Sequence, residues 1–159
     1  INKNELDIFS LIKKYNLNFR ISKDTVDAYG RNLLGFFNYP NTITIMDSAL
    51  KNILLAANEC GFPLDEDTIK RIVCSHELFH YLENKDPKEF YTKTAKCVTG
   101  HFFKFERKSH PIILSEIGAM AFASKLNNLS FSPYILDYLL LYKIDKKKAS
   151  DLYEAVTED

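Results

Sequence analysis

The sequence has little of what marks secreted, membrane-spanning or nucleic-acid-binding proteins. It contains only three cysteines, at positions 60, 74 and 97, and this small odd number argues against a disulfide framework and for a reducing compartment. Lysine plus arginine and aspartate plus glutamate both total 21, so no net charge is available to attract a nucleic-acid backbone or an anionic membrane. No apolar run approaches the roughly 18 residues that a membrane-spanning helix needs.

Internal repeats, low-complexity segments and long linkers are also missing, which argues against a repeat array or a second domain. The composition is that of an ordinary globular protein, because the 159 residues are 46% hydrophobic and 26% charged and such a chain can bury a sizeable core. No secretory signal is recognisable after Ile1. We therefore expect one domain over residues 1–159, in the cytoplasm, with no nucleic-acid or membrane partner.

The spacing of apolar residues predicts a mostly helical α+β domain with a small antiparallel sheet. Helical spacing extends over six ranges: 4–16, 47–60, 65–84, 111–124, 132–140 and 145–156. Residues suited to cap or begin these helices are Asp47 or Ser48, Asp65, Ser132 with Pro133, and Asp145. Strand patterns cover three ranges, of which the last two are expected to form a hairpin: 19–21, 33–39 and 42–46. The alternation in residues 42–45 predicts a half-buried strand.

The segment His76-Glu77-Leu78-Phe79-His80 carries a motif with a definite chemistry. On a helix, positions i and i+4 share a face, so His76 and His80 can direct two imidazoles at one zinc ion. Glu77 can then reach a water at that ion and take its proton. The alternative is two buried histidines satisfied by backbone carbonyls, with Glu77 as a surface charge.

A catalytic zinc needs a third protein ligand and an open position, and Glu116 is the candidate ligand. It lies in a helix whose other residues are unusually small, among them Gly118, Ala119 and Ala123. Small residues let two helices approach closely, and Gly118 is tolerated in mid-helix at a cost of about 1 kcal/mol relative to alanine. The alternative is that Glu116 only interacts with the helix N-terminus.

Taken together, His76-Glu77-x-x-His80 and Glu116-x-x-Ala119-x-x-Phe122-Ala123 resemble the ImmA/IrrE family of small intracellular zinc metallopeptidases. The family pattern has asparagine where this chain has Met120. The resemblance covers about residues 29–142 and includes the hairpin before the motif. It implies a zincin-like fold with the sheet beside the motif helix, zinc bound by two histidines and the glutamate, and a glutamate base. It also implies a protein partner, such as a helix-turn-helix repressor of a mobile element or stress regulon.

Residues 88–110 are rich in polar and aromatic side chains. Tyr91, His101 and His110 are candidates for a group that stabilises the oxyanion formed during peptide hydrolysis. Cys97 and His101 stand at i and i+4, but a second zinc site there would need another ligand. The expected hairpin offers a further possibility, because an edge strand could bind a substrate backbone by strand addition.

These observations favour a zinc-dependent peptidase that hydrolyses a peptide bond in a protein partner. His76, His80 and Glu116 would hold Zn²⁺, and Glu77 would act as the base. Two alternatives stay open: a zinc-binding regulatory or interaction module without proteolytic turnover, and a structural domain in which the motif arose by chance.

Overall fold

The computed structural model describes residues 7–24, 33–102, 105–109 and 111–157. In chain order the elements are α1 (Ile8–Lys14), β1 (Asn18–Ser22), β2 (Gly35–Asn38), β3 (Thr42–Met46), α2 (Asp47–Glu59), α3 (Glu66–Lys85), the 3₁₀ turn η2 (Pro87–Glu89), α4 (Tyr91–Thr94), β4 (Cys97–Phe102), β5 (Phe105–Ser109), α5 (Ile112–Leu126), α6 (Ile135–Ile144) and α7 (Lys146–Thr157). The class is α+β and mostly helical, as expected.

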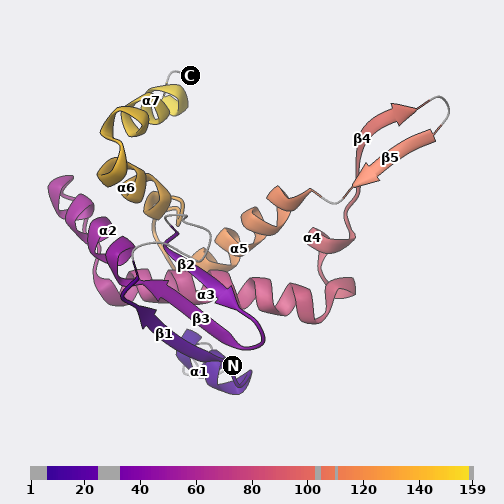
Figure 1. The fold of residues 1–159 in the computed structure, drawn as a ribbon, viewed down its shortest axis with the longest axis horizontal. Coiled ribbons are helices and arrows are strands. Elements are labelled where there is room, and N and C mark those ends of the chain that lie inside the picture. Colours follow the sequence, from indigo (N-terminus) through magenta and orange to yellow (C-terminus); the bar gives the residue numbers. More distant parts are fainter. Residues whose placement is uncertain (1–6, 25–32, 103–104, 110, 158–159) are drawn as a thin grey trace.

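The long helix α3 is the centre of the arrangement (Figure 1). The three-stranded sheet lies along one side of it, and α5 packs against another side. Helix α6 packs on α2, and α7 follows α6. The β4–β5 hairpin projects away from the rest of the chain (Figure 1). Helix α3 therefore brings the sheet and α5 to either side of the motif.

The sheet is mixed, not purely antiparallel as expected. Its strand order is β1-β3-β2, with β2 antiparallel and β1 parallel to β3. The hairpin of β2 and β3 confirms the prediction, because its turn residues and alternating pattern are local signals. The parallel pairing of β1 was missed because it joins segments that β2 separates along the chain, and no local pattern shows which strands will pair.

Strand β3 is buried along most of its length, so the prediction of a half-buried strand was wrong. Ile43, Thr44 and Ile45 are all fully buried. Thr44 tolerates burial because its hydroxyl accepts hydrogen bonds from Arg20 Nε of β1, at 3.0 Å, and from Asn38 Nδ2 of β2, at 2.9 Å. A buried hydroxyl with such partners avoids the penalty of an unsatisfied polar group.

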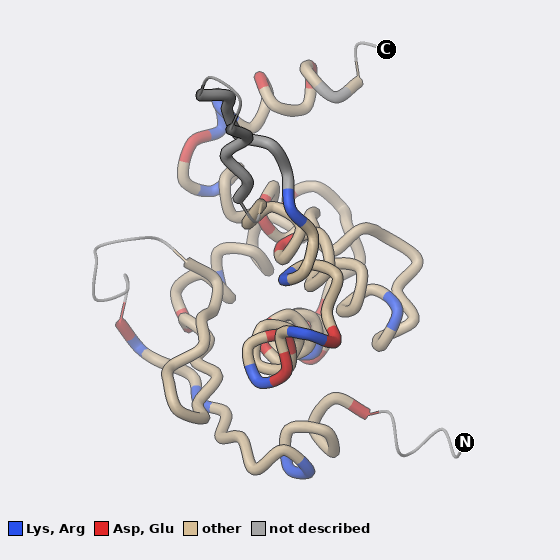
Figure 2. The backbone as a smooth tube through the Cα atoms, turned by 90° about the vertical axis from the view of Figure 1, so that its right-hand side faces the viewer, with Lys and Arg blue, Asp and Glu red and all other residues tan. Residues whose placement is uncertain are grey.

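The hydrophobic core lies between the sheet, α1, α2, α3 and α6. Its most deeply buried side chains include Ile8, Ile43, Ile45, Ile53, Ile69, Leu78 and Leu139. Acidic and basic residues are interspersed along the described backbone (Figure 2). None of the helices in the described ranges has the length and apolarity needed to cross a membrane.

Several helix boundaries follow the sequence signals and others do not. The Asp65 side chain caps α3 by accepting the Thr68 N–H at 2.7 Å, and Asp145 accepts the Lys148 N–H at the start of α7. Asp47 is the first residue of α2 rather than its cap. Helix α6 begins at Ile135, after the expected start at Ser132, and α1 begins only at Ile8.

Candidate metal centre

Helix α3 places both motif histidines on its inward side. Glu66 and Asp67 occupy its first turn and Lys85 its last, so the charges complement the helix dipole at both ends. Buried apolar residues then recur at helical spacing. Ile69 lies two turns before His76, and Ile72 and Val73 lie one turn before it. His76 and His80 continue that stripe, which is why both rings point into the protein rather than into bulk solvent.

Helix α5 brings Glu116 to these rings by lying unusually close to α3. A Cβ built on Gly118 would stand only 2.7 Å from Phe79 Cζ and 3.0 Å from Thr92 Cγ2. Ala119 and Ala123, on the face of α5 that carries Glu116, have no exposed surface. The small residues predicted to permit close approach therefore do so, and Glu116 reaches across the contact.

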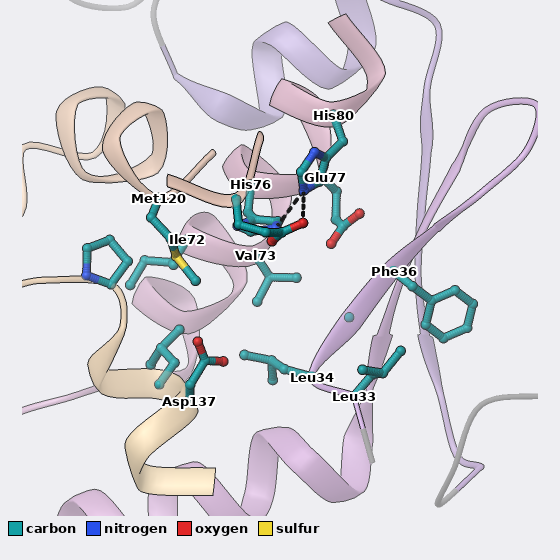
Figure 3. A pocket seen from close by; sticks show the side chains of 14 residues that line it. Leu33, Leu34, Phe36, Ile72, Val73, His76, Glu77, His80, Met120 and Asp137 are labelled. Carbon is teal, nitrogen blue, oxygen red and sulfur yellow. Dashed lines mark hydrogen bonds and ion pairs between the residues drawn. The ribbon is translucent and has the colours of Figure 1, made fainter. Parts of the chain in front are cut away.

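Three ligand atoms converge in the space between α3 and α5 (Figure 3). Nε2 of His76 and Nε2 of His80 are 2.9 Å apart. The Glu116 carboxylate lies 3.3 Å from Nε2 of His76 and 3.5 Å from Nε2 of His80. Donors bound tetrahedrally to one zinc at 2.0–2.1 Å are separated by about 3.3 Å. The donor set and its spacing thus fit a zinc ion.

The environment keeps His76 in the form that binds metals. Burial, assisted by the neighbouring His80, lowers the pKa of His76 to about 4. The ring is therefore neutral at neutral pH and needs to release no proton before its Nε2 lone pair can coordinate a cation.

A buried carboxylate that the sequence analysis missed stands behind His80. Glu83 is only 1% exposed and lies 3.0 Å from Nδ1 of His80. Because an ionised carboxylate only accepts hydrogen bonds, Nδ1 must carry the proton, which leaves Nε2 free as a ligand. Glu83 also accepts hydrogen bonds from Thr92, at 2.7 Å, and from Ser115, and pairs with Lys93 at 3.2 Å.

These contacts decide the ionisation of Glu83. Burial by itself raises the pKa of this carboxyl, but the hydrogen bonds from Ser115, Thr92, His80 and Lys93 outweigh it and lower the pKa to about 2. Glu83 is therefore a fixed negative charge. Its place was detectable in the sequence, because Glu83 continues the helical stripe that contains His76 and His80.

Glu77 takes a position distinct from the three ligand residues. It is 8% exposed and accepts a hydrogen bond from the backbone N–H of Phe37 in β2. Burial, together with the charge of Glu116, raises the pKa of Glu77 to about 7, against the opposing effects of His80 and Phe37. The carboxylate thus lies between the motif helix and the sheet.

A cavity of about 350 Å³ opens beside the ligand atoms. Four elements or their flanking residues line it: β2, α3, α5 and α6. His76, Glu77, His80 and Glu116 all contribute to its surface, so water or a substrate could reach them. Asp137 of α6 lines the same cavity and was not foreseen, because nothing local in the sequence connects α6 with the motif.

Of the three candidates for an oxyanion-stabilising group, the structure describes the side chain of Tyr91 alone. Tyr91 is 76% exposed and is not among the described residues that line the cavity. Residue His110 and the side chains of Cys97 and His101 lie outside what the structure describes. Cys60 and Cys74 are free thiols, in keeping with the prediction that no disulfide framework exists.

No protein-family model, curated protein or solved structure matches this chain. A group formed by His76, His80 and Glu116 can hold a metal ion, with a carboxylate base candidate and an accessible cavity beside it.

Proposed function

We infer that the protein is a zinc-dependent peptidase acting on a protein or peptide substrate. The proposal rests on the positions of His76, His80 and Glu116, whose donor atoms are as close together as ligands of one metal ion would be. These residues line a cavity that Glu77 also lines. Two imidazoles and one carboxylate with an open fourth position are the ligand set of catalytic zinc in several peptidases. Structural zinc sites are instead closed by four protein ligands.

The chain's own residues would divide the work of hydrolysis. Bound zinc would supply Lewis-acid chemistry, by acidifying a water molecule and polarising the scissile carbonyl. Glu77 would accept a proton from the attacking water as its oxygen forms a bond to the carbonyl carbon. Glu77 would then pass that proton to the amine as the carbon–nitrogen bond breaks. Glu83 would hold His80 in the tautomer that ligates.

Strand β2 supports a peptide rather than a small molecule as the substrate. Within the described residues it pairs only with β3, which makes it an edge strand. Gly35 and Phe36 of β2 line the cavity, and a Cβ on Gly35 would stand 2.5 Å from Val73 Cγ1 on α3. The edge is therefore held against the motif helix, where an extended peptide could add as a further strand.

The resemblance to ImmA/IrrE peptidases supports an intracellular protein partner, such as a helix-turn-helix repressor. Part of that resemblance rests on residues that the structure brings together, namely His76, His80 and Glu116.

The first test is the metal content of untagged protein purified without chelator. We expect about one zinc per chain in the parent and in Glu77→Gln, and much less in His80→Ala and Glu116→Ala. Cleavage of any substrate found should be abolished in Glu77→Gln, because zinc remains but the base is lost. A parent that takes up no zinc would overturn the proposal.

Two other outcomes would change the proposal rather than the metal site. Full zinc affinity in Glu116→Ala would show that the third ligand lies elsewhere. A zinc-loaded parent that cleaves no peptide would identify a zinc-dependent interaction module instead of a peptidase.

A further inference from the structure

The cavity beside the metal centre contains a carboxylate that the proposed mechanism does not use. Asp137 lies at the opposite end of the cavity from His76 and His80 (Figure 3). No hydrogen bond or ion pair joins its side chain to any other residue in the described part of the chain. None of the described residues that line the cavity is a lysine or an arginine. Asp137 stands in the first turn of α6, where the helix dipole favours its negative charge, but no cationic side chain of the described residues pairs with it.

The walls between the two ends of this cavity are apolar. Side chains of Ile72, Val73 and Met120 lie between the imidazoles and Asp137, and the side chain of Leu34 lies beside Asp137 (Figure 3). These side chains come from three separate parts of the chain: the residue before β2, helix α3 and helix α5. A side chain that entered from the metal end would cross an apolar surface before it met a charge.

Asp137 is both reached by water and surrounded by protein. Its residue is exposed, yet burial of the carboxyl, followed by repulsion from Glu116, raises its pKa. These two properties agree when a group lines an open cavity, because solvent fills the space while protein atoms enclose it. A cation entering the cavity would displace that solvent, and the attraction would then act in the lower dielectric of the surrounding protein, which strengthens it.

The charges of the metal centre do not satisfy Asp137. A bound zinc ion would be held by Glu116, His76 and His80 at the other end of the cavity, so Asp137 would still have no cation in direct contact with it. A substrate residue suited to this cavity has an aliphatic stem for the walls and a positive tip for the carboxylate. Lysine and arginine have this form, since both bury their methylene stems and keep a cationic end group.

We propose that this cavity is a specificity subsite in which Asp137 selects a lysine or arginine side chain of the substrate, adjacent to the bond that is cleaved. The inference rests on the proposed peptidase function and narrows its substrate class to peptides with a basic residue at one fixed position. Asp137 contacts the substrate side chain and takes no part in the bond-breaking step.

Cleavage of a defined mixture of unstructured peptides, read by mass spectrometry, tests the inference directly. We expect the zinc-loaded parent to cut bonds with lysine or arginine at one fixed position about tenfold faster than bonds with norleucine or glutamine there. Asp137→Asn should bring these rates close together while keeping full zinc content. Asp151→Asn is the matched control, because Asp151 is an exposed carboxylate on α7 that does not line the cavity.

A binding measurement supplies a readout that needs no turnover. Peptide hydroxamates carrying lysine, norleucine or glutamate at that position are titrated against zinc-loaded parent and Asp137→Asn. The lysine compound should bind the parent most tightly, and its advantage over norleucine should disappear in Asp137→Asn but persist in Asp151→Asn.

The outcomes separate this inference from the peptidase proposal. Cleavage and hydroxamate binding without a preference for a basic residue would overturn the role of Asp137 and leave the peptidase intact. The same holds if the preference survives in Asp137→Asn. Zinc-loaded protein that neither cleaves any peptide nor binds any hydroxamate would overturn the peptidase, and this subsite with it.

Discussion

The carboxylate of Glu83 contacts His80, a candidate metal ligand, on one side and residues of α4 and α5 on the other. We predict that Glu83→Gln lowers zinc affinity about 10- to 100-fold. The amide cannot supply the negative charge that fixes the proton on Nδ1 of His80, and it leaves the Lys93 ammonium without its partner. Competition with a chromophoric chelator measures the affinity, and the visible spectrum of the cobalt(II)-substituted protein reports the geometry of the ligands.

A purely structural role for Glu83 would give a different result. In that case Glu83→Gln would lower the unfolding free energy of the metal-free protein, but zinc affinity and the cobalt spectrum would stay those of the parent. Glu89→Gln, in an exposed residue of η2, is the matched control and should change neither quantity.

Residues of the site differ in how far the sequence could reveal them. His76, Glu77 and His80 lie within one short motif, so helix geometry alone relates them. Glu116 needed the extra signal of small neighbours on its helix. Asp137 had no such signal, because it comes to the cavity only through the packing of α6 on α2.

At the scale of secondary-structure elements, the contact between α3 and α5 sets the position of Glu116. We predict that Gly118→Ala weakens zinc binding, although alanine is favoured over glycine by about 1 kcal/mol in a helix. The new methyl group would meet Phe79 Cζ at 2.7 Å, and overpacking of this kind typically costs about 1–3 kcal/mol. The two helices must separate or Phe79 must move, and Glu116 lies only two residues away.

Two variants isolate the cause. Ala121→Gly, at an exposed position of α5, should make that helix less stable, because glycine has a lower helix propensity than alanine, but it should leave zinc affinity unchanged. Gly118→Ala in a Phe79→Leu background should recover part of the lost affinity, because leucine lacks the atom that clashes. Equal zinc affinity in Gly118→Ala and parent, measured by the same chelator competition, would show that the close approach is not needed.

Elements with local signals were predicted well, and elements without them were not. The Asp65 cap, the acidic first turn and the apolar stripe of α3 are all contained in one stretch of chain, and that helix was foreseen nearly to its ends. Strands β4 and β5 were not foreseen, because residues 88–110 show neither helical nor alternating spacing. The predicted cap of α2 was wrong because Asp47 and Ser48, although both are typical cap residues, lie inside the helix, and Met46 takes the cap position without a side-chain hydrogen bond.

For the whole molecule, the α+β class followed from composition and periodicity, but the relative placement of the elements did not. The cavity is built by β2, α3, α5 and α6, and only the first three were connected to the motif by the sequence. Pairing of β1 with β3 and packing of α6 on α2 are long-range contacts. Such contacts depend on the complementarity of complete surfaces, which the spacing of residues along one segment does not encode.

If His76, His80 and Glu116 bind zinc as proposed, the ion should stabilise the whole fold, because these residues belong to two helices that are distant in sequence. A ligand that binds only the folded state adds about 4 kcal/mol when its free concentration is a thousand times its dissociation constant. At about 2–4 °C per kcal/mol for a chain of this size, we expect the Tm of zinc-loaded parent to fall by about 10 °C on addition of excess chelator. His80→Ala has lost one of the ligands from α3, so chelator should barely change its Tm, and that variant should unfold near the temperature of metal-free parent. If neither chelator nor added zinc changes the Tm of the parent, no metal links α3 to α5. A metal ion that binds only the folded protein must stabilise it, and must therefore raise its Tm.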